Sequence, residues 1–128
     1  MQVRDYMTPA PTTIAVGADY KEAFEILAKG SLHHLPVADD SGQLVGILSR
    51  RDLDLAARYF QDHPAEIGEI MHTPVTTIAP DADLIVAVDM MRKDYIRCLP
   101  VSEDGGKHLV GIITETDLMR ALHDLLER

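Results

Sequence analysis

The chain has 128 residues, of which 46% are hydrophobic and 26% charged, the ordinary balance of a small globular protein. Its 12 Lys and Arg against 21 Asp and Glu give a formal net charge of −9, which disfavours binding to a nucleic-acid duplex. The single cysteine, Cys98, excludes an internal disulfide and a multi-cysteine zinc site. No apolar run approaches the roughly 20 residues that span a bilayer, and the first residues lack the apolar core of a signal peptide, so we expect a cytoplasmic protein without membrane insertion.

The second half of the chain repeats the first. A shift of 64 residues superposes Thr-Thr-Ile-Ala at residues 12–15 on the same four residues at 76–79. Leu-Pro-Val and Leu-Val-Gly-Ile also occur twice in the same order, the latter after one inserted residue. Matches in this order indicate two copies of one supersecondary unit. We expect residues 1–62 to form the first repeat and residues 63–128 the second.

Each copy predicts the same order of elements: a strand, a helix, two strands and a second helix. The first copy begins with an extended stretch at 11–16 and a helix from the N-cap Asp19 to Gly30. The apolar stripe of this helix is Ala23, Phe24, Ile26 and Leu27. Strands at 35–38 and 44–49 around a turn follow, and then a helix from Asp52 to about Phe60. The second copy has an extended stretch at 75–80, a helix from Asp83 with the stripe Val86, Ala87, Met90 and Met91, strands at 99–102 and 109–114, and a helix from Asp117 to about Glu127.

The last strand of each copy, at residues 44–48 and 109–113, is apolar without alternation. Such strands are typically buried on both faces. Because half a chain with three short strands is marginally stable alone, the second face needs a cover. We therefore expect an α+β fold in which two β-α-β-β-α repeats pack through their sheets with pseudo-twofold symmetry and leave a cleft between them.

Several segments, each present in both halves of the sequence, carry a family resemblance. Gly-Ile-Leu-Ser-Arg-Arg-Asp at 46–52 and Gly-Ile-Ile-Thr-Glu-Thr-Asp at 111–117 resemble the Gly-Ile-Val-Thr-x-x-Asp signature of the CBS domain, named after cystathionine β-synthase. His-His-Leu-Pro-Val at 33–37 and its counterpart at 96–101 resemble the family's Arg-His-Leu-Pro-Val strand, and the Met-Thr-Pro openings also fit. The resemblance covers residues 3 to 124 and implies a tandem pair, or Bateman module.

For function, the resemblance implies a regulatory module and not an enzyme. Such pairs bind adenosine-containing ligands, namely AMP, ADP, ATP or S-adenosylmethionine, in the cleft between the repeats, and need no obligatory cofactor. The resemblance also implies association of two modules into a disc, that is, a homodimer. We expect a helix pair of each copy to present apolar side chains for this contact, including Phe24, Leu27, Leu55, Tyr59, Leu122, Leu125 and Leu126.

Asp52 and Asp117 each follow a predicted buried strand and open a helix. An aspartate in this place can cap the helix, and its carboxylate can also accept hydrogen bonds from the two hydroxyls of a ribose. The two roles can coexist, and the resemblance favours ribose contact. A ligand phosphate would lie instead near the hydroxyl of Ser49 or Thr114, free backbone N–H groups and a cationic side chain.

The two copies differ in their cations. Arg51 precedes Asp52, whereas Thr116 precedes Asp117, where members of the family often have an arginine. The difference predicts two unequal sites, of which the Asp52 site, with Arg51 and Arg97 nearby, suits an anionic phosphate better. Histidines at 33 and 34 would raise phosphate affinity as the pH falls, if they face the pocket.

Adenine requires a flat apolar slot. Val75 and Ile96 could line it in one site, and Pro11 and Leu32 in the other, although each can equally be a core residue. Cys98 is more simply a small buried hydrophobe than a redox sensor. No spacing predicts a metal site or a catalytic residue. The candidate ligand-binding residues are Thr8, Pro11, Leu32, His33, His34, Pro36, Ser49, Arg51, Asp52, Val75, Ile96, Arg97, Cys98, Pro100, Thr114 and Asp117.

These observations predict a regulatory module that binds an adenosine nucleotide, senses energy or a metabolite, and acts on an unknown partner in trans or on a domain absent from this chain. The alternative is a structural or protein-interaction pair whose cleft is degenerate and binds nothing. Thr116 and Cys98 favour this alternative, and retention of both Ser/Thr-x-x-Asp segments disfavours it. An enzyme is disfavoured because no base–nucleophile pair is recognisable.

Overall fold

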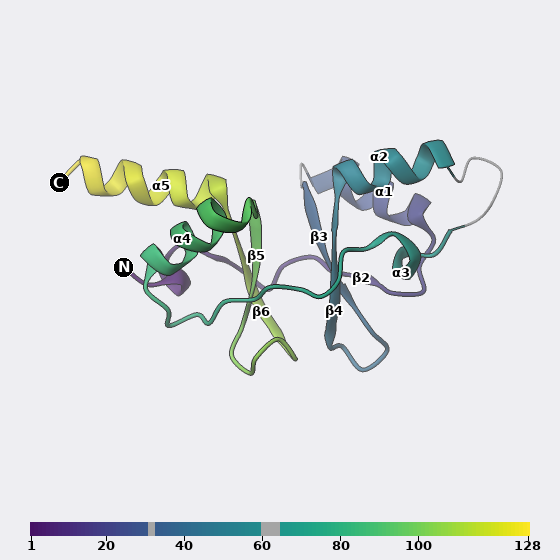
Figure 1. Ribbon diagram of the computed structural model, residues 1–128, viewed down its shortest axis with the longest axis horizontal. Coiled ribbons are helices and arrows are strands. Elements are labelled where there is room, and N and C mark those ends of the chain that lie inside the picture. Colours follow the sequence, from purple (N-terminus) through teal and green to yellow (C-terminus); the bar gives the residue numbers. More distant parts are fainter. Residues whose placement is uncertain (31–32, 60–64) are drawn as a thin grey trace. The chain divides into compact units, whose positions relative to one another are not determined.

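The computed structural model describes residues 1–30, 33–59 and 65–128, which divide into two compact units (Figure 1). Residues 12–75 form one unit, here called the Asp52 unit. Residues 1–11 join residues 76–128 to form the other, the Asp117 unit. The first eleven residues therefore pack with the second repeat and not with the elements that follow them directly along the chain. The expected repeat boundary between residues 62 and 63 lies outside the described residues.

The Asp52 unit has the predicted order of elements. It contains β2 (Ile14–Ala15), α1 (Tyr20–Gly30), β3 (His34–Ala38), β4 (Leu44–Ser49), α2 (Arg50–Tyr59) and the short α3 (Ile67–Ile70). Its sheet has the order β2-β3-β4, in which β2 runs parallel to β3 and β3 antiparallel to β4. The helix α2 ends at Tyr59 among the described residues, and its predicted last residue, Phe60, lies outside them.

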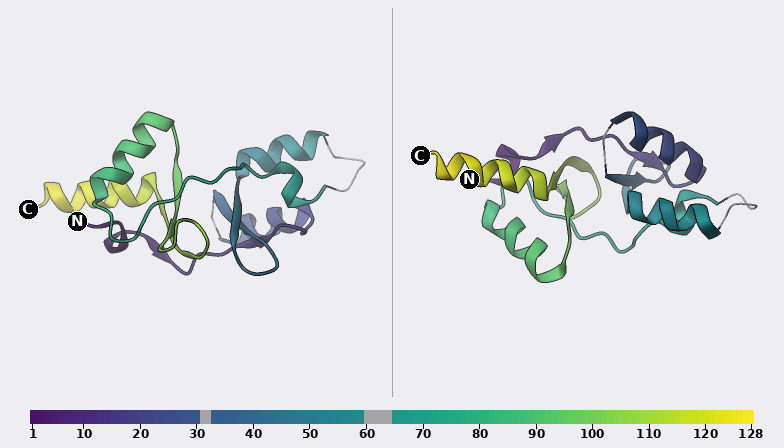
Figure 2. Two further views of the ribbon diagram at one scale, coloured as in Figure 1. Left: turned by 60° about the horizontal axis from the view of Figure 1, so that its bottom comes forward. Right: turned by 90° about the horizontal axis from the view of Figure 1, so that it is seen from above.

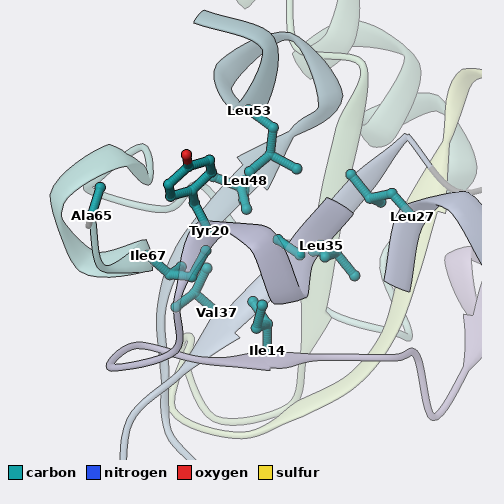
Figure 3. Close-up of a cluster of buried hydrophobic side chains, with 10 residues drawn as sticks. Ile14, Tyr20, Leu27, Leu35, Val37, Leu48, Leu53, Ala65 and Ile67 are labelled. Carbon is teal, nitrogen blue, oxygen red and sulfur yellow. The ribbon is translucent and has the colours of Figure 1, made fainter. Parts of the chain in front are cut away.

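The core of the Asp52 unit lies between its sheet and the helices α1 and α2 (Figure 3). Leu27 of α1, Leu35 of β3, Leu48 of β4 and Leu53 of α2 have no exposed surface. The expectation that Leu27 faces outward is therefore wrong, and Phe24, expected to face outward with it, is half-buried against the same core. Leu27 follows the equally buried Ala23 by four residues, and this spacing places both on the helix face that covers the sheet.

The Asp117 unit has the same helix–hairpin–helix order, but its third strand differs. It contains η1 (Val3–Asp5), β1 (Thr8–Pro9), α4 (Leu84–Asp94), β5 (Cys98–Ser102), β6 (Leu109–Thr114) and α5 (Glu115–Leu126), with the sheet order β1-β6-β5. In this unit β1 pairs antiparallel with the last strand, and the strand predicted at 75–80 is reduced to a single parallel bridge between Ile78 and Val101. Val86 was expected in the buried stripe of α4, but it is 42% exposed. The buried stripe is instead Leu84, Ala87 and Met91, which face the core at helical spacing.

The N-terminal segment completes the Asp117 unit. Val3 N–H donates to Ala82 O at 2.9 Å, and Leu84 N–H donates to Met1 O at 2.9 Å, at the start of α4. Strand β1 then runs antiparallel to β6, with Thr8 opposite Ile112. Figures 1 and 2 both show this purple segment beside α4 and α5.

The strand β4 was expected to be buried on both faces. Gly46 and Leu48 are buried, whereas Val45 and Ile47 are half-buried, so one face is less covered than expected. The strand β6 has the same pattern. Among the helices of the described ranges, none combines the length and apolar character needed to cross a membrane.

Candidate functional site

Each unit carries one predicted Ser/Thr-x-x-Asp segment at the junction between its last strand and the following helix. In the Asp52 unit, Ser49 N–H donates to Asp52 Oδ2 at 2.9 Å, and Asp52 N–H donates to Ser49 Oγ at 3.1 Å. This reciprocal pair is a capping box, which satisfies backbone donors at the start of α2. The other carboxylate oxygen, Oδ1, accepts a hydrogen bond from His72 Nε2 at 3.0 Å.

The Asp117 carboxylate has a fuller set of donors. Its Oδ2 accepts from Thr114 N–H at 2.9 Å and from Thr114 Oγ1 at 3.3 Å. Its Oδ1 accepts from Arg120 Nη2 at 3.2 Å. The side chains of Asp117 and Asp52 are 11% and 14% exposed. Both aspartates take part in helix capping, but the expectation that each one is itself the N-cap and opens its helix is wrong. The helices begin at Arg50 and Glu115, Ser49 and Thr114 occupy the N-cap position, and each aspartate is the third helical residue. The outer carboxylate oxygens of the two aspartates have different partners.

The strand register brings further predicted residues to these junctions. His34 lies opposite Ser49 in the Asp52 unit, and Cys98 lies opposite Thr114 in the Asp117 unit. Arg50 N–H donates to His33 O at 2.9 Å, so that the exposed His33 is adjacent to the start of α2.

The same register places the remaining strand and helix candidates. Glu115 N–H donates to Arg97 O at 3.2 Å in the Asp117 unit, so the exposed Arg97 is adjacent to the start of α5. Arg51, in the first turn of α2, is also exposed. The buried Pro36 and Pro100 lie two residues after His34 and Cys98 in their strands. Thr8 and Pro100 both pair with Ile112 of β6.

The proposed adenine slots combine residues of different units. Val75 belongs to the Asp52 unit, whereas Ile96 and Pro11 belong to the Asp117 unit, and all three are half-buried. Leu32, the expected partner of Pro11, lies outside the described residues. These slots, and the expected proximity of Arg97 to Arg51, stay predictions.

Two partners of the aspartates were missed from the sequence. His72 stands at the position that corresponds to Thr8 in the repeat alignment, and Thr8 was itself a candidate. That correspondence was the available signal for His72. Arg120 follows Asp117 by one helical turn, a spacing at which side chains meet on a helix.

Cys98 is buried, as expected. Burial raises the pKa of its thiol to about 12, and the nearby charge of Asp117 contributes in the same direction. The thiolate is the reactive form, so this cysteine is a poor nucleophile at neutral pH. Between the ordinary pKa of a thiol and about 12, the unfolded chain loses this proton whereas the folded protein keeps it. The stability that the buried thiol contributes is therefore complete below the ordinary thiol pKa and declines as the pH rises toward 12.

We expect Cys98 in the folded protein to react with a thiol-specific disulfide reagent at pH 8 at least about a hundredfold more slowly than in denaturant. The absorbance change on release of the reagent's thiolate measures both rates. Equal rates in the two conditions would contradict the burial of this thiol.

The comparison with known families agrees with this geometry. A model of the CBS domain matches residues 3–58 and again residues 67–124. The chain belongs to the CBS domain family. Each match spans one capping box and the hairpin before it, so the chain is a CBS pair with an internal repeat, as predicted.

Solved structures of CBS-pair proteins resemble the whole chain. A Vibrio cholerae protein assigned to acetoin utilization, AcuB, is 36% identical, with a TM-score of 0.86 over 99% of this chain and 93% of that chain. The CBS domain pair of protein MJ0100, solved with 5′-methylthioadenosine and S-adenosyl-L-methionine, is 32% identical, with a TM-score of 0.84 over 97% of each chain. CBSX2 of Arabidopsis thaliana, solved with AMP, is 27% identical, with a TM-score of 0.83 over 99% of this chain and 98% of that chain.

The first curated relatives of this CBS pair are much longer proteins. The chain spans between 15% and 24% of their length, at 30% to 35% identity. These relatives are an A-adding tRNA nucleotidyltransferase of Aquifex aeolicus and homoserine O-acetyltransferases of Methanocorpusculum labreanum and Methanococcoides burtonii.

Proposed function

We propose that this CBS pair is a regulatory module that binds an adenosine nucleotide and has no catalytic activity of its own. The observation that carries the proposal is the presence of an intact capping box at the strand–helix junction of both units. The box holds each carboxylate in one orientation before any ligand arrives. Such preorganisation lowers the entropic cost of binding.

The hydrogen-bonding capacity of Asp52 supports ribose recognition. An ionised carboxylate offers about four lone-pair sites. The side chain of Asp52 accepts from Ser49 N–H and from His72, which leaves room for two ribose hydroxyls. The adenosine moiety is also what AMP, 5′-methylthioadenosine and S-adenosyl-L-methionine have in common, and relatives of this chain are solved with these ligands.

The cations of the Asp52 unit favour a phosphate-bearing ligand there. Arg51 is exposed in the first turn of α2, and His33 is exposed just before β3. A helix N-terminus with such side chains attracts anions. We propose that AMP, ADP or ATP binds at the Asp52 site in preference to S-adenosylmethionine, and that binding alters the contact with an unidentified regulated protein.

The Asp117 site fits the alternative of a degenerate site that binds no ligand better than it fits nucleotide binding. Its carboxylate already accepts three hydrogen bonds, from Thr114 N–H, Thr114 Oγ1 and Arg120, and Thr116 replaces the arginine often found before the aspartate. A diol would have to displace one of these donors. We therefore propose that this second site is structural or binds ligands weakly.

Thermal-shift measurements with AMP, ADP, ATP and S-adenosylmethionine test the proposed function. Adenosine nucleotides should raise the melting temperature, because a ligand of the folded state alone stabilises it. Guanosine monophosphate and ribose 5-phosphate serve as controls for the base and the sugar phosphate. Melting curves that do not change with any adenosine ligand would contradict nucleotide binding and favour a purely structural module.

We further propose that the module is a homodimer, with exposed apolar side chains of its helices in the contact. These side chains are Leu55 and Tyr59 on α2 and Leu122, Leu125 and Leu126 on α5. Light scattering is expected to give twice the chain mass for the wild-type protein. The double variant Leu122→Glu/Leu126→Glu should be monomeric, whereas Lys93→Glu, an exposed charge change on α4, should stay dimeric. A monomeric wild-type protein at high concentration would contradict this proposal.

A further inference from the structure

His72 is held beside the Asp52 carboxylate by its own backbone. His72 N–H donates to Ile47 O at 2.9 Å, and Ile47 N–H donates to His72 O at 3.2 Å. The backbone approaches β4 closely here, as a Cβ added at Gly46 would lie 3.2 Å from His72 O. The imidazole itself is 73% exposed, with Nε2 on Asp52 Oδ1. Any group that binds Oδ1 therefore stands next to this imidazole.

In the other unit, the outer carboxylate oxygen of the aspartate is bonded to a side chain from a different element. Thr8 lies against Ile112 as His72 lies against Ile47, so the two positions are equivalent. Asp117 Oδ1 is bonded instead to Arg120, which also donates to Tyr6 O at 2.9 Å. A guanidinium keeps its charge at all relevant pH values, whereas an imidazole changes charge between about pH 5 and 8.

We propose that His72 is a specificity-determining residue of the Asp52 site, which shifts its preference toward adenosine ligands with a 5′-phosphate as the pH falls. This inference rests on the proposed function. A protonated imidazole attracts the phosphate of AMP but exerts no comparable attraction on the neutral methylthio group of 5′-methylthioadenosine. Competition between His72 and a ribose hydroxyl for Oδ1 weakens both ligands equally and cancels in the ratio of their dissociation constants.

Other charges at this junction contribute to the total pH dependence. The arginines stay charged, and two further histidines lie at this junction. Only the part of the pH dependence that a His72 variant removes is therefore assigned to His72. Besides Asp52 itself, the charged or titratable residues of the adjoining elements are Arg50, Arg51, Asp54 and Arg58 on α2, His33 just before β3, His34 in β3, and Glu69 on α3.

Isothermal titration with AMP and with 5′-methylthioadenosine at about pH 6 and pH 8 tests the proposal. The preference for AMP should rise about three- to tenfold more on acidification in the wild type than in His72→Gln, which keeps a donor to Asp52 without a charge. The phosphate of free AMP also gains a proton near pH 6, and this contribution is the same for both proteins. His72→Lys should keep the preference at both pH values, and His108→Gln, which changes an exposed histidine in the turn between β5 and β6, should behave as the wild type.

The outcomes separate this inference from the function on which it rests. An equal pH dependence of the ratio in the wild type and in His72→Gln would overturn the role of His72 and leave nucleotide binding in place. A wild-type protein that binds neither ligand at either pH would overturn the proposed function, and this inference with it.

Discussion

Replacement of Asp52 by Asn is expected to weaken AMP binding at least about a hundredfold, whereas Asp117→Asn leaves most of the binding in place. A hydrogen bond to a charged group contributes about 1.5–3 kcal/mol, and a ribose can donate two to Asp52. Asn removes the charge and turns one acceptor into a donor without changing the size of the side chain. Isothermal titration measures the dissociation constant for each variant.

The matched control for this prediction is Ser49→Ala. It removes the hydroxyl that caps Asp52 N–H but keeps the carboxylate and its bond from Ser49 N–H. We expect it to cost about 1 kcal/mol of stability with binding reduced much less than in Asp52→Asn. AMP binding by Asp52→Asn that equals the wild type would contradict the ribose-binding role of Asp52. Complete loss in Asp117→Asn would contradict the inequality of the two sites.

Deletion of residues 1–11 is expected to destabilise the Asp117 unit by at least about 4 kcal/mol. The deletion removes Val3, which is fully buried and whose burial contributes about 1.5–3 kcal/mol. It also removes β1 and the backbone hydrogen bonds to Ala82 and Leu84, each with a net contribution of about 1 kcal/mol. A loss of this size should lower the melting temperature by about 10 °C or more.

Side-chain contacts of Tyr6 also depend on this segment. Tyr6 Oη donates to Asp124 Oδ2 at 2.7 Å, and Arg120 lies over the tyrosine ring, 5.7 Å from its centroid. The hydrogen bond raises the pKa of the Tyr6 phenol and lowers that of the Asp124 carboxyl. The contribution of Asp124 to stability is therefore present at neutral pH and is lost as the pH falls through its lowered pKa.

The control for the deletion is a chain shortened by the exposed residues 127–128 after α5, which should keep wild-type stability. Hydrogen exchange measures the effect element by element. Amides of β6 and α5 should exchange faster in the chain that lacks residues 1–11, and amides of β3 and β4 should change much less. Unchanged protection of β6 would show that the N-terminal segment does not complete this unit.

The sequence was sufficient for the features that local chemistry decides. The repeat, the two hairpins and the helix start at Asp19 follow from spacing, turn residues and capping preferences between near neighbours. Asp19 accepts from Lys21 N–H at 3.1 Å, as a cap at that position requires. The participation of Asp52 and Asp117 in helix capping was predictable for the same reason, because Ser49 and Thr114 stand three residues before them, although the N-cap position itself was assigned three residues too late.

Features that depend on contacts distant in sequence were not predictable in this way. Thr8 pairs with Ile112, and nothing local in the first eleven residues indicates that they complete the other repeat's sheet. The prediction that Leu27 faces outward was wrong because tertiary contacts decide which face of α1 covers the sheet. The bond from His72 to Asp52 requires the chain to return to β4 after α3, and this return is a property of the tertiary fold.

A crystal structure of the protein with AMP tests the nucleotide-binding account most directly, through the distance from the Asp52 carboxylate to the ribose hydroxyls. The account predicts at least one oxygen–oxygen distance of about 2.5–3.0 Å, as in a charge-assisted hydrogen bond. A ribose bound away from Asp52, or crystals that take up no AMP at saturating concentration, would contradict it.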